Sequence, residues 1–277
     1  MRAVSTRRDL QGIGIASSTP FTDDAQLVAD EARHVEELGF TTLWRSGVLP
    51  MVEVAVRATD HIPLATGIIP VSTVASADVA TAYHALEQEH PGRFVVGLGG
   101  ARDQHPLRTL GAYLDALDEA GVPAGRRVLA ALGPKMVDLA RERASGTYPY
   151  LVTPSYVADA RARLGQDHLL AALVMTAPTT DRDLVRRVAG EPLAFLTGQG
   201  GYRRNLLRLG FSESDIDEVS DRLLDGIVAW GDDDAIAARV AEYHAAGADQ
   251  VVLRILDVEG DGDLHASRER LASALLG

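Results

Sequence analysis

The sequence contains no cysteine, a deficit of positive charge and no long apolar run. Without cysteine, the chain can form neither disulfides nor thiolate metal sites, and it offers no cysteine nucleophile. The sequence has 27 Lys and Arg and 39 Asp and Glu, which gives a net charge of −12. Because a negatively charged protein is repelled by nucleic-acid phosphates, we do not expect nucleic acid as a partner. No apolar stretch approaches the roughly 20 residues of a membrane span, and Met1 to Asp9 lacks an apolar signal core. We therefore expect a cytoplasmic chain without a membrane partner.

The composition is that of a globular protein. Hydrophobic residues make up 46% of the 277 and charged residues 24%, which supplies ample core and excludes a disordered or fibrous chain. The length suits either two average domains or one α/β barrel. Because no low-complexity tract or linker divides the chain, we predict a single domain over residues 1–277.

Short β-rich apolar runs alternate with helical segments along the chain. Their lengths suit strands that are buried on both faces, as in a parallel sheet. Eight strands, each followed by helix, favour a (β/α)8 TIM barrel of the α/β class over an open doubly wound sheet. The expected strands are Gly12–Ala16, Thr41–Arg45, Leu64–Pro70, Phe94–Leu98, Arg127–Ala131, Tyr148–Val152, Leu170–Met175 and Gln250–Leu256.

One stretch departs from this alternation. Between the seventh and eighth expected strands, Asp181–Tyr243 contains three or more helical segments where one would suffice. We predict a helical insertion outside the barrel wall, with part of it over the mouth at the carboxyl ends of the strands.

Two strand ends are unusually rich in glycine. Gly67 interrupts a β-branched strand, which indicates a bulge, a close approach by a ligand or an ordinary kink. Gly97, Gly99 and Gly100 lack the spacing of a dinucleotide fingerprint, and would let a flat ring lie against the mouth.

Two further segments carry chemistry of their own. Leu132–Lys135 runs from a strand into a helix with Pro134 at its first position, where free amides, the helix dipole and Lys135 could hold an anion or simply begin a helix. Gly198–Leu206 is either a mobile loop whose Tyr202 and neighbouring arginines reach over the mouth, or a solvated helix start.

Two kinds of site are not supported. His84 and His90 stand six residues apart on a helix and do not share a face, so we expect no metal site. No G-x-S-x-G nucleophile elbow is present either.

Several segments together resemble a known family. In order, Leu38–Trp44, Thr66–Ile68, Pro91–Gly99 and Leu132–Met136 resemble the bacterial luciferase-like superfamily of flavin and deazaflavin oxidoreductases. Further likeness to an F420-dependent subgroup is carried by Tyr148–Pro154, Tyr202–Asn205 and Ala229–Asp232. The resemblance spans nearly the whole chain.

The resemblance implies a cofactor at the barrel mouth, either F420 or, as the alternative, FMN. Its ring would lie against a non-proline cis peptide after the third strand, which maps onto Gly67–Ile68, and its phosphate would meet backbone amides after the fifth strand. The implied cofactor contacts are Gly67, Ile68, Gly97, Leu98, Gly99, Ala131, Leu132, Gly133 and Lys135.

The implied reaction is hydride transfer between F420 and a small organic substrate, which we expect Arg45, Arg102, His105 or Tyr148 to contact. After the second strand, however, Arg45 to Val48 replaces the acid and histidine of related enzymes. An FMN-dependent monooxygenase, or a degenerate member acting as a binding or scaffolding protein, are the alternatives. Relatives are commonly homodimers.

Overall fold

The computed structural model describes residues 6–101, 103–260 and 262–277. Eight parallel strands close into a barrel, as predicted, and Gln250 of the last strand completes it by pairing with both Gly12 and Ala171. In barrel order the strands are β1 (Gly12–Ala16), β2 (Leu43–Arg45), β3 (Leu64–Thr66), β5 (Phe94–Gly99), β6 (Arg127–Leu129), β7 (Gly146–Thr147), β8 (Leu169–Ala177) and β10 (Gln250–Ile255).

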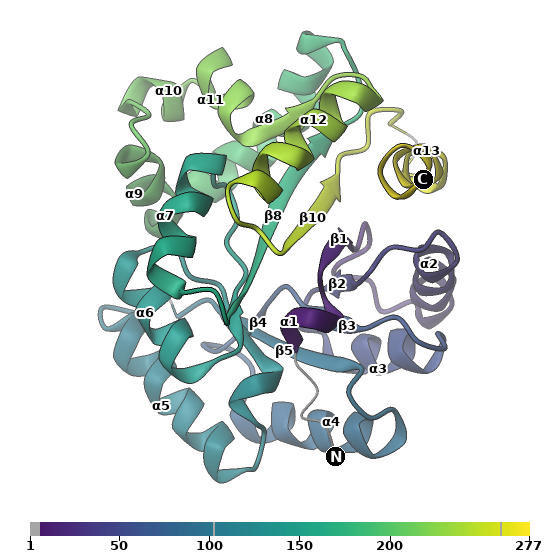
Figure 1. Ribbon diagram of the computed structural model, residues 1–277, viewed down its shortest axis with the longest axis vertical. Helices are drawn as coiled ribbons and strands as arrows, with labels where there is room; N and C mark the ends of the chain where they lie inside the picture. The colour runs from purple at the N-terminus through teal and green to yellow at the C-terminus, as the bar shows by residue number, and fades with distance from the viewer. Residues whose placement is uncertain (1–5, 102, 261) are drawn as a thin grey trace.

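Helices surround the strands and complete the (β/α)8 TIM barrel (Figure 1). The helices around the barrel are α2 (Ala25–Glu37), α3 (Leu49–Arg57), α4 (Ser76–Glu89), α5 (Pro106–Glu119), α6 (Pro134–Arg143), α7 (Pro154–Leu164), α12 (Asp233–Ala245) and α13 (His265–Leu276); α1 (Thr6–Asp9) and the 3-10 turn η1 (Ala124–Arg126) are short additions. Across the described residues, no helix is both long and apolar enough to cross a bilayer.

The strand sequences are apolar throughout because both faces of the barrel wall are buried. Successive residues of a strand point to opposite faces. In β2, for example, Leu43 packs in the layer between strands and helices, whereas Trp44 packs inside the barrel with Val128 of β6 and Val252 of β10. This alternation decides which strand-end side chains can reach the mouth.

The sixth barrel strand differs from the prediction. It is Gly146–Thr147 rather than Tyr148–Val152, and beyond it only Tyr150 forms a bridge, with Leu173. Pro149 has no N–H to donate to a ladder, and Leu151 has a positive φ of 54° that ends the extended backbone.

The expected third strand, Leu64–Pro70, is also interrupted. It consists of β3 and the two-residue β4 (Ile69–Pro70), which pairs with β5 beyond a break at Gly67 and Ile68.

The insertion between β8 and β10 is mainly helical, as predicted, but it also contains a short strand that the sequence analysis missed. Its helices lie in the upper left part of Figure 1, where α8 is next to β8 and α9, α10 and α11 are farther out. The strand β9 extends the sheet beside the end of β8, pairing Val228 with Met175, and is not one of the eight barrel strands. The elements are α8 (Arg182–Thr197), α9 (Gly200–Arg208), α10 (Glu213–Asp217), α11 (Asp221–Ile227) and β9 (Val228–Trp230).

Candidate functional site at the barrel mouth

The peptide between Gly67 and Ile68 is cis, which confirms the distortion predicted at the end of the third strand. Gly67 is exposed and Ile68 partly exposed, so this peptide faces solvent at the mouth. A Cβ at position 67 would lie 2.7 Å from the Tyr148 ring. Glycine is therefore required at position 67, because any side chain there would clash with the Tyr148 ring beneath it.

The glycines of β5 do not form the open face that the sequence suggested. A Cβ on Gly97 would lie 1.7 Å from the Thr66 carbonyl oxygen, and one on Gly99 would lie 2.9 Å from the Ala130 Cβ. Both glycines are buried. The Thr66 hydroxyl also accepts from the Gly97 amide at 2.7 Å and donates to its carbonyl at 3.0 Å. These glycines thus permit close packing of the barrel wall.

A partly exposed apolar surface, which we call the shelf, remains at the mouth. It consists of Gly67, Ile68 and Ala130. A Cβ on Gly99 would touch both the Ala130 and Ile68 side chains, so the shelf is continuous from the end of β3 to the end of β6.

Aromatic side chains fill the barrel beneath the shelf. Trp44 and Tyr148 stack with ring centres 3.9 Å apart and planes 2° apart, and the Trp44 indole N–H donates to the Gln250 side-chain carbonyl at 3.0 Å. Tyr148, predicted as a substrate contact, is therefore part of a buried floor. Burial also raises the pKa of Tyr148, so its hydroxyl stays protonated at neutral pH.

A set of hydrogen-bond donors gathers where the shelf ends at α6. Gly133 is the N-cap of α6 and has no side-chain cap; Pro134 has no N–H and the Met136 amide donates to the Gly133 carbonyl, so the Lys135 amide is the first-turn donor without an intrahelical acceptor among the described residues. Arg208 of α9 reaches this turn, and its Nη2 donates to the Leu132 carbonyl at 3.2 Å and to the Asn205 Oδ1 at 2.9 Å. Asn205 is buried, and its Nδ2 has no partner among the described residues. We call this set the α6 pocket.

The remaining predicted cofactor residues lie behind the wall. Leu98 and Ala131 are buried in the layer between strands and helices. The Ala131 carbonyl already accepts a hydrogen bond from the Tyr156 hydroxyl at 2.8 Å. These two residues can support the shelf and the α6 pocket, but their side chains do not face the mouth.

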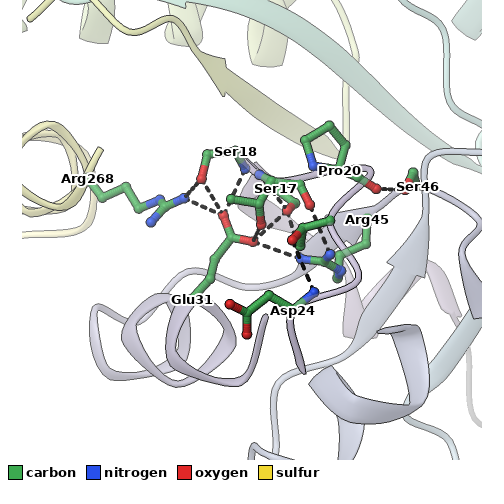
Figure 2. Close-up of polar contacts among 10 residues, drawn as sticks. Ser17, Ser18, Pro20, Asp24, Glu31, Arg45, Ser46 and Arg268 are labelled. Carbon is green, nitrogen blue, oxygen red and sulfur yellow. Dashed lines mark hydrogen bonds and ion pairs between the residues drawn. The ribbon is translucent and has the colours of Figure 1, made fainter. Parts of the chain in front are cut away.

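Arg45 follows the inward-facing Trp44 and therefore points outward. It is buried, and its Nη1 lies 2.8 Å from the Glu31 carboxylate. Figure 2 shows Glu31 between Arg45 and Arg268, with Ser17 and Ser18 also donating to its carboxylate. We therefore do not propose Arg45 as a substrate contact.

The other two predicted substrate contacts lie beyond β5. His105 is exposed just before α5, and its backbone N–H donates to the Asp103 carboxylate at 2.6 Å. Arg102 lies outside the described residues. Within the described ranges, no three histidine or carboxylate side chains come together as metal ligands.

Sequence reasoning missed several residues at the mouth. Arg254 could have been found, because it continues the inward face of β10 after Gln250 and Val252. Asn205 lay within the Tyr202–Asn205 segment that carries the resemblance, but its contact with Arg208 was not predicted. Arg208 carried no local signal, since only the packing of α9 beside α6 brings it to the Leu132 carbonyl. Two surface hollows lie elsewhere, one beside Trp230 and one beside His244.

Comparison with known proteins agrees with this geometry. The family model described as Luciferase-like monooxygenase matches residues 122–250, while no curated protein matches the chain. An F420-dependent secondary alcohol dehydrogenase, solved with an F420-acetone adduct, is similar with a TM-score of 0.72 and 14% identity, covering 96% of this chain and 98% of that one.

Two further solved structures are similar over almost their full length. A coenzyme F420 dependent tetrahydromethanopterin reductase from Methanopyrus kandleri has a TM-score of 0.66 and 17% identity, covering 96% of this chain and 98% of its own. The FMN-bound oxygenating constituent of 3,6-diketocamphane monooxygenase from Pseudomonas putida has a TM-score of 0.68 and 14% identity, covering 96% and 97%. Residues 122–250 of the chain thus match the luciferase-like family model, and the chain has a barrel fold in common with solved F420- and FMN-dependent proteins.

Proposed function

We propose that this chain is an oxidoreductase that binds F420 at the barrel mouth and transfers hydride between this deazaflavin and a small organic substrate. The observation that carries the proposal is the continuity of the shelf with the α6 pocket. Ala130 ends the shelf, and two residues later the Leu132 carbonyl accepts a hydrogen bond from Arg208. A flat apolar surface beside a cluster of anion-binding donors suits a ring joined to a phosphate.

The shelf fits the ring of such a cofactor. Gly67 has no side chain above the floor, and Ile68 and Ala130 offer apolar contact. The stacked Trp44 and Tyr148 keep the floor rigid. Rigid apolar surroundings orient a ring without competing hydrogen bonds, which favours a fixed approach of the substrate.

The α6 pocket fits the phosphate. Around Gly133 there is room, because the nearest atom to a Cβ placed there is the Arg208 Nη1 at 3.5 Å. The unpartnered Asn205 Nδ2 is a buried donor that an anion would satisfy. Arg208 forms no ion pair with a carboxylate in the part of the chain that the structure describes, so its charge is available to a phosphate.

When bound, the deazaflavin would supply or accept the hydride. The residues of this chain hold the ring, anchor the phosphate and exclude water from the floor. Tyr148 remains protonated, so it can stabilise a neighbouring charge by donation but cannot serve as a general base at neutral pH.

The proposal is tested by titrating the purified protein separately with F420 and with FMN and following ligand fluorescence. Tight binding of F420 alone supports it. Tight binding of FMN alone favours a luciferase-like monooxygenase on the same shelf, and binding of neither would leave a non-catalytic member of the fold and overturn the proposal.

Variants of the α6 pocket should weaken cofactor binding unequally. We expect Lys135→Ala to cost about 1 kcal/mol, because the lysine is exposed. Arg208→Met should cost more, about 1.5–3 kcal/mol for a lost charged hydrogen bond, and Gly133→Val should also exceed the lysine variant by crowding the approach of the phosphate. Dissociation constants from the same titrations measure each loss.

The matched control for Arg208 is on the same helix. Arg203 is paired with Glu213 and Asp217, so Arg203→Met should leave the cofactor affinity unchanged. Equal affinities for the wild type and all three pocket variants would place the phosphate elsewhere.

A further inference from the structure

A second arginine, Arg254 of β10, faces the mouth. In the barrel order, β10 is separated from β6 by β7 and β8. In β10, Val251, Leu253 and Ile255 belong to the outer apolar layer. Val252 packs inside the barrel, so the next inward residue is Arg254 at the mouth.

Arg254 lies beside Tyr150, which itself contacts a second aromatic ring. Its guanidinium carbon lies 5.9 Å from the centre of the Tyr150 ring. Tyr150 in turn meets Tyr202 of α9 edge to face, with ring centres 6.2 Å apart. The arginine is half-buried, so a cation is held at a site with little water around it.

Neither the cation nor the nearest hydroxyl is satisfied within the described residues. Arg254 has no carboxylate within ion-pair distance there, whereas the more deeply buried Arg161 and Arg268 are paired with Asp249 and Glu31. Tyr150 is 7% exposed, and its hydroxyl has no hydrogen-bond partner in that same part of the chain. The guanidinium is near enough for its charge and a weak hydrogen-bond contact to oppose the rise in the Tyr150 pKa that burial causes, but no hydrogen bond within the usual distance and angle joins the two groups.

We propose that Arg254 and Tyr150 form a carboxylate subsite, so that the substrate of the proposed oxidoreductase is an organic acid. A carboxylate would satisfy both the fork of the guanidinium and the tyrosine hydroxyl. A single planar fork matches a carboxylate, whereas a phosphate dianion has oxygens for more donors than these two residues supply. The aromatic surroundings suit an acid with an apolar or aromatic body.

The assignment of the acid as substrate rests on the proposed function, but its binding can be measured independently. Benzoate and its neutral analogue benzamide serve as probes, titrated against the full chain with and without F420 and followed by calorimetry or ligand-observed NMR. We expect the wild type to bind benzoate at least about ten-fold more tightly than benzamide. Arg254→Gln should abolish this preference, Arg254→Lys should retain part of it, and Tyr150→Phe should weaken benzoate binding several-fold without affecting benzamide.

Arg239→Gln is the matched control, because Arg239 is also partly buried but is paired with Glu242 outside the mouth. It should leave both probes unaffected, and the melting temperature of each variant verifies folding. No preference for benzoate in the wild type, or the same loss in the control, would overturn the subsite. If benzoate binding depends on Arg254 but neither F420 nor FMN binds, the carboxylate subsite stands and the proposed oxidoreductase function is refuted. If a cofactor binds but benzoate is not preferred over benzamide, the proposed function stands and the subsite is refuted.

Discussion

Glu31→Gln is expected to lower the free energy of unfolding by about 3–5 kcal/mol, the usual loss when one partner of a buried ion pair is removed. Glu31 is 3% exposed and lies between Arg45 and Arg268, which are both 2% exposed. Its carboxylate contacts both guanidinium groups. Without its charge, two buried cations would remain in one small volume. Urea denaturation at neutral pH measures the loss.

The neighbouring Asp30→Asn is the control. Asp30 pairs with Arg33 at 2.7 Å on the exposed face of α2, so its loss should cost less than about 1 kcal/mol. Equal losses in the two variants would contradict the role assigned to the buried network.

The contribution of Glu31 should also depend on pH. Burial opposes its ionisation, but Arg268 and the hydrogen bonds from Ser17 and Ser18 outweigh burial and hold the pKa below its ordinary value of 4.5. A carboxyl whose pKa is depressed on folding stabilises the fold above its unfolded pKa, and this stabilisation disappears as the pH falls through the folded value. The difference between wild type and Glu31→Gln should therefore be constant near neutrality and narrow only below pH 4.5.

Gly97→Ala is expected to reach or exceed the upper end of the usual overpacking cost of about 1–3 kcal/mol. The added methyl would be 1.7 Å from the Thr66 carbonyl oxygen. That oxygen is part of the backbone of β3, so it cannot rotate away as a flexible side chain could. Separating β3 from β5 would also disturb the two hydrogen bonds between the Thr66 hydroxyl and Gly97. Thermal or urea unfolding measures the effect.

Gly111→Ala supplies the same chemical change with the opposite expected sign. Gly111 lies inside α5, and no atom would come within 4 Å of the new methyl. Alanine in a helix interior is favoured over glycine by about 0.5–1 kcal/mol, so this variant should be slightly more stable than the wild type. A loss of stability at position 111, or none at position 97, would contradict the packing described for the barrel wall.

The barrel could be predicted because its strands are apolar on both faces, a pattern that the sequence displays directly. The boundaries of the sixth strand could not, since Pro149 and the positive φ of Leu151 interrupt pairing inside an apolar run. The third strand was similarly read as continuous, although β4 resumes only after the cis peptide between Gly67 and Ile68. An apolar pattern thus identifies a strand better than it identifies which residues pair.

The candidate site was predictable in part. The cis peptide was expected from the family resemblance. Which strand-end arginine faces the mouth could be decided only from the inward and outward positions along each strand. Arg45 follows an inward Trp44 and faces the helices, while Arg254 follows an outward Leu253 and faces the mouth. Arg208 reaches the α6 pocket only through packing between helices distant in sequence, which no local pattern records.

The network around Glu31 also bears on the order of events in folding. Glu31 and Arg268 are separated by 237 residues, and Arg7 pairs with Asp249 across 242. Contacts of such high sequence separation form slowly, because the chain must first lose the entropy of a very long loop. During synthesis β1 has no β10 to pair with, and Glu31 has no Arg268, until nearly all of the described chain has been made. The first strand edge therefore stays open to wrong partners for most of translation, and barrel closure is the step at which aggregation competes with folding.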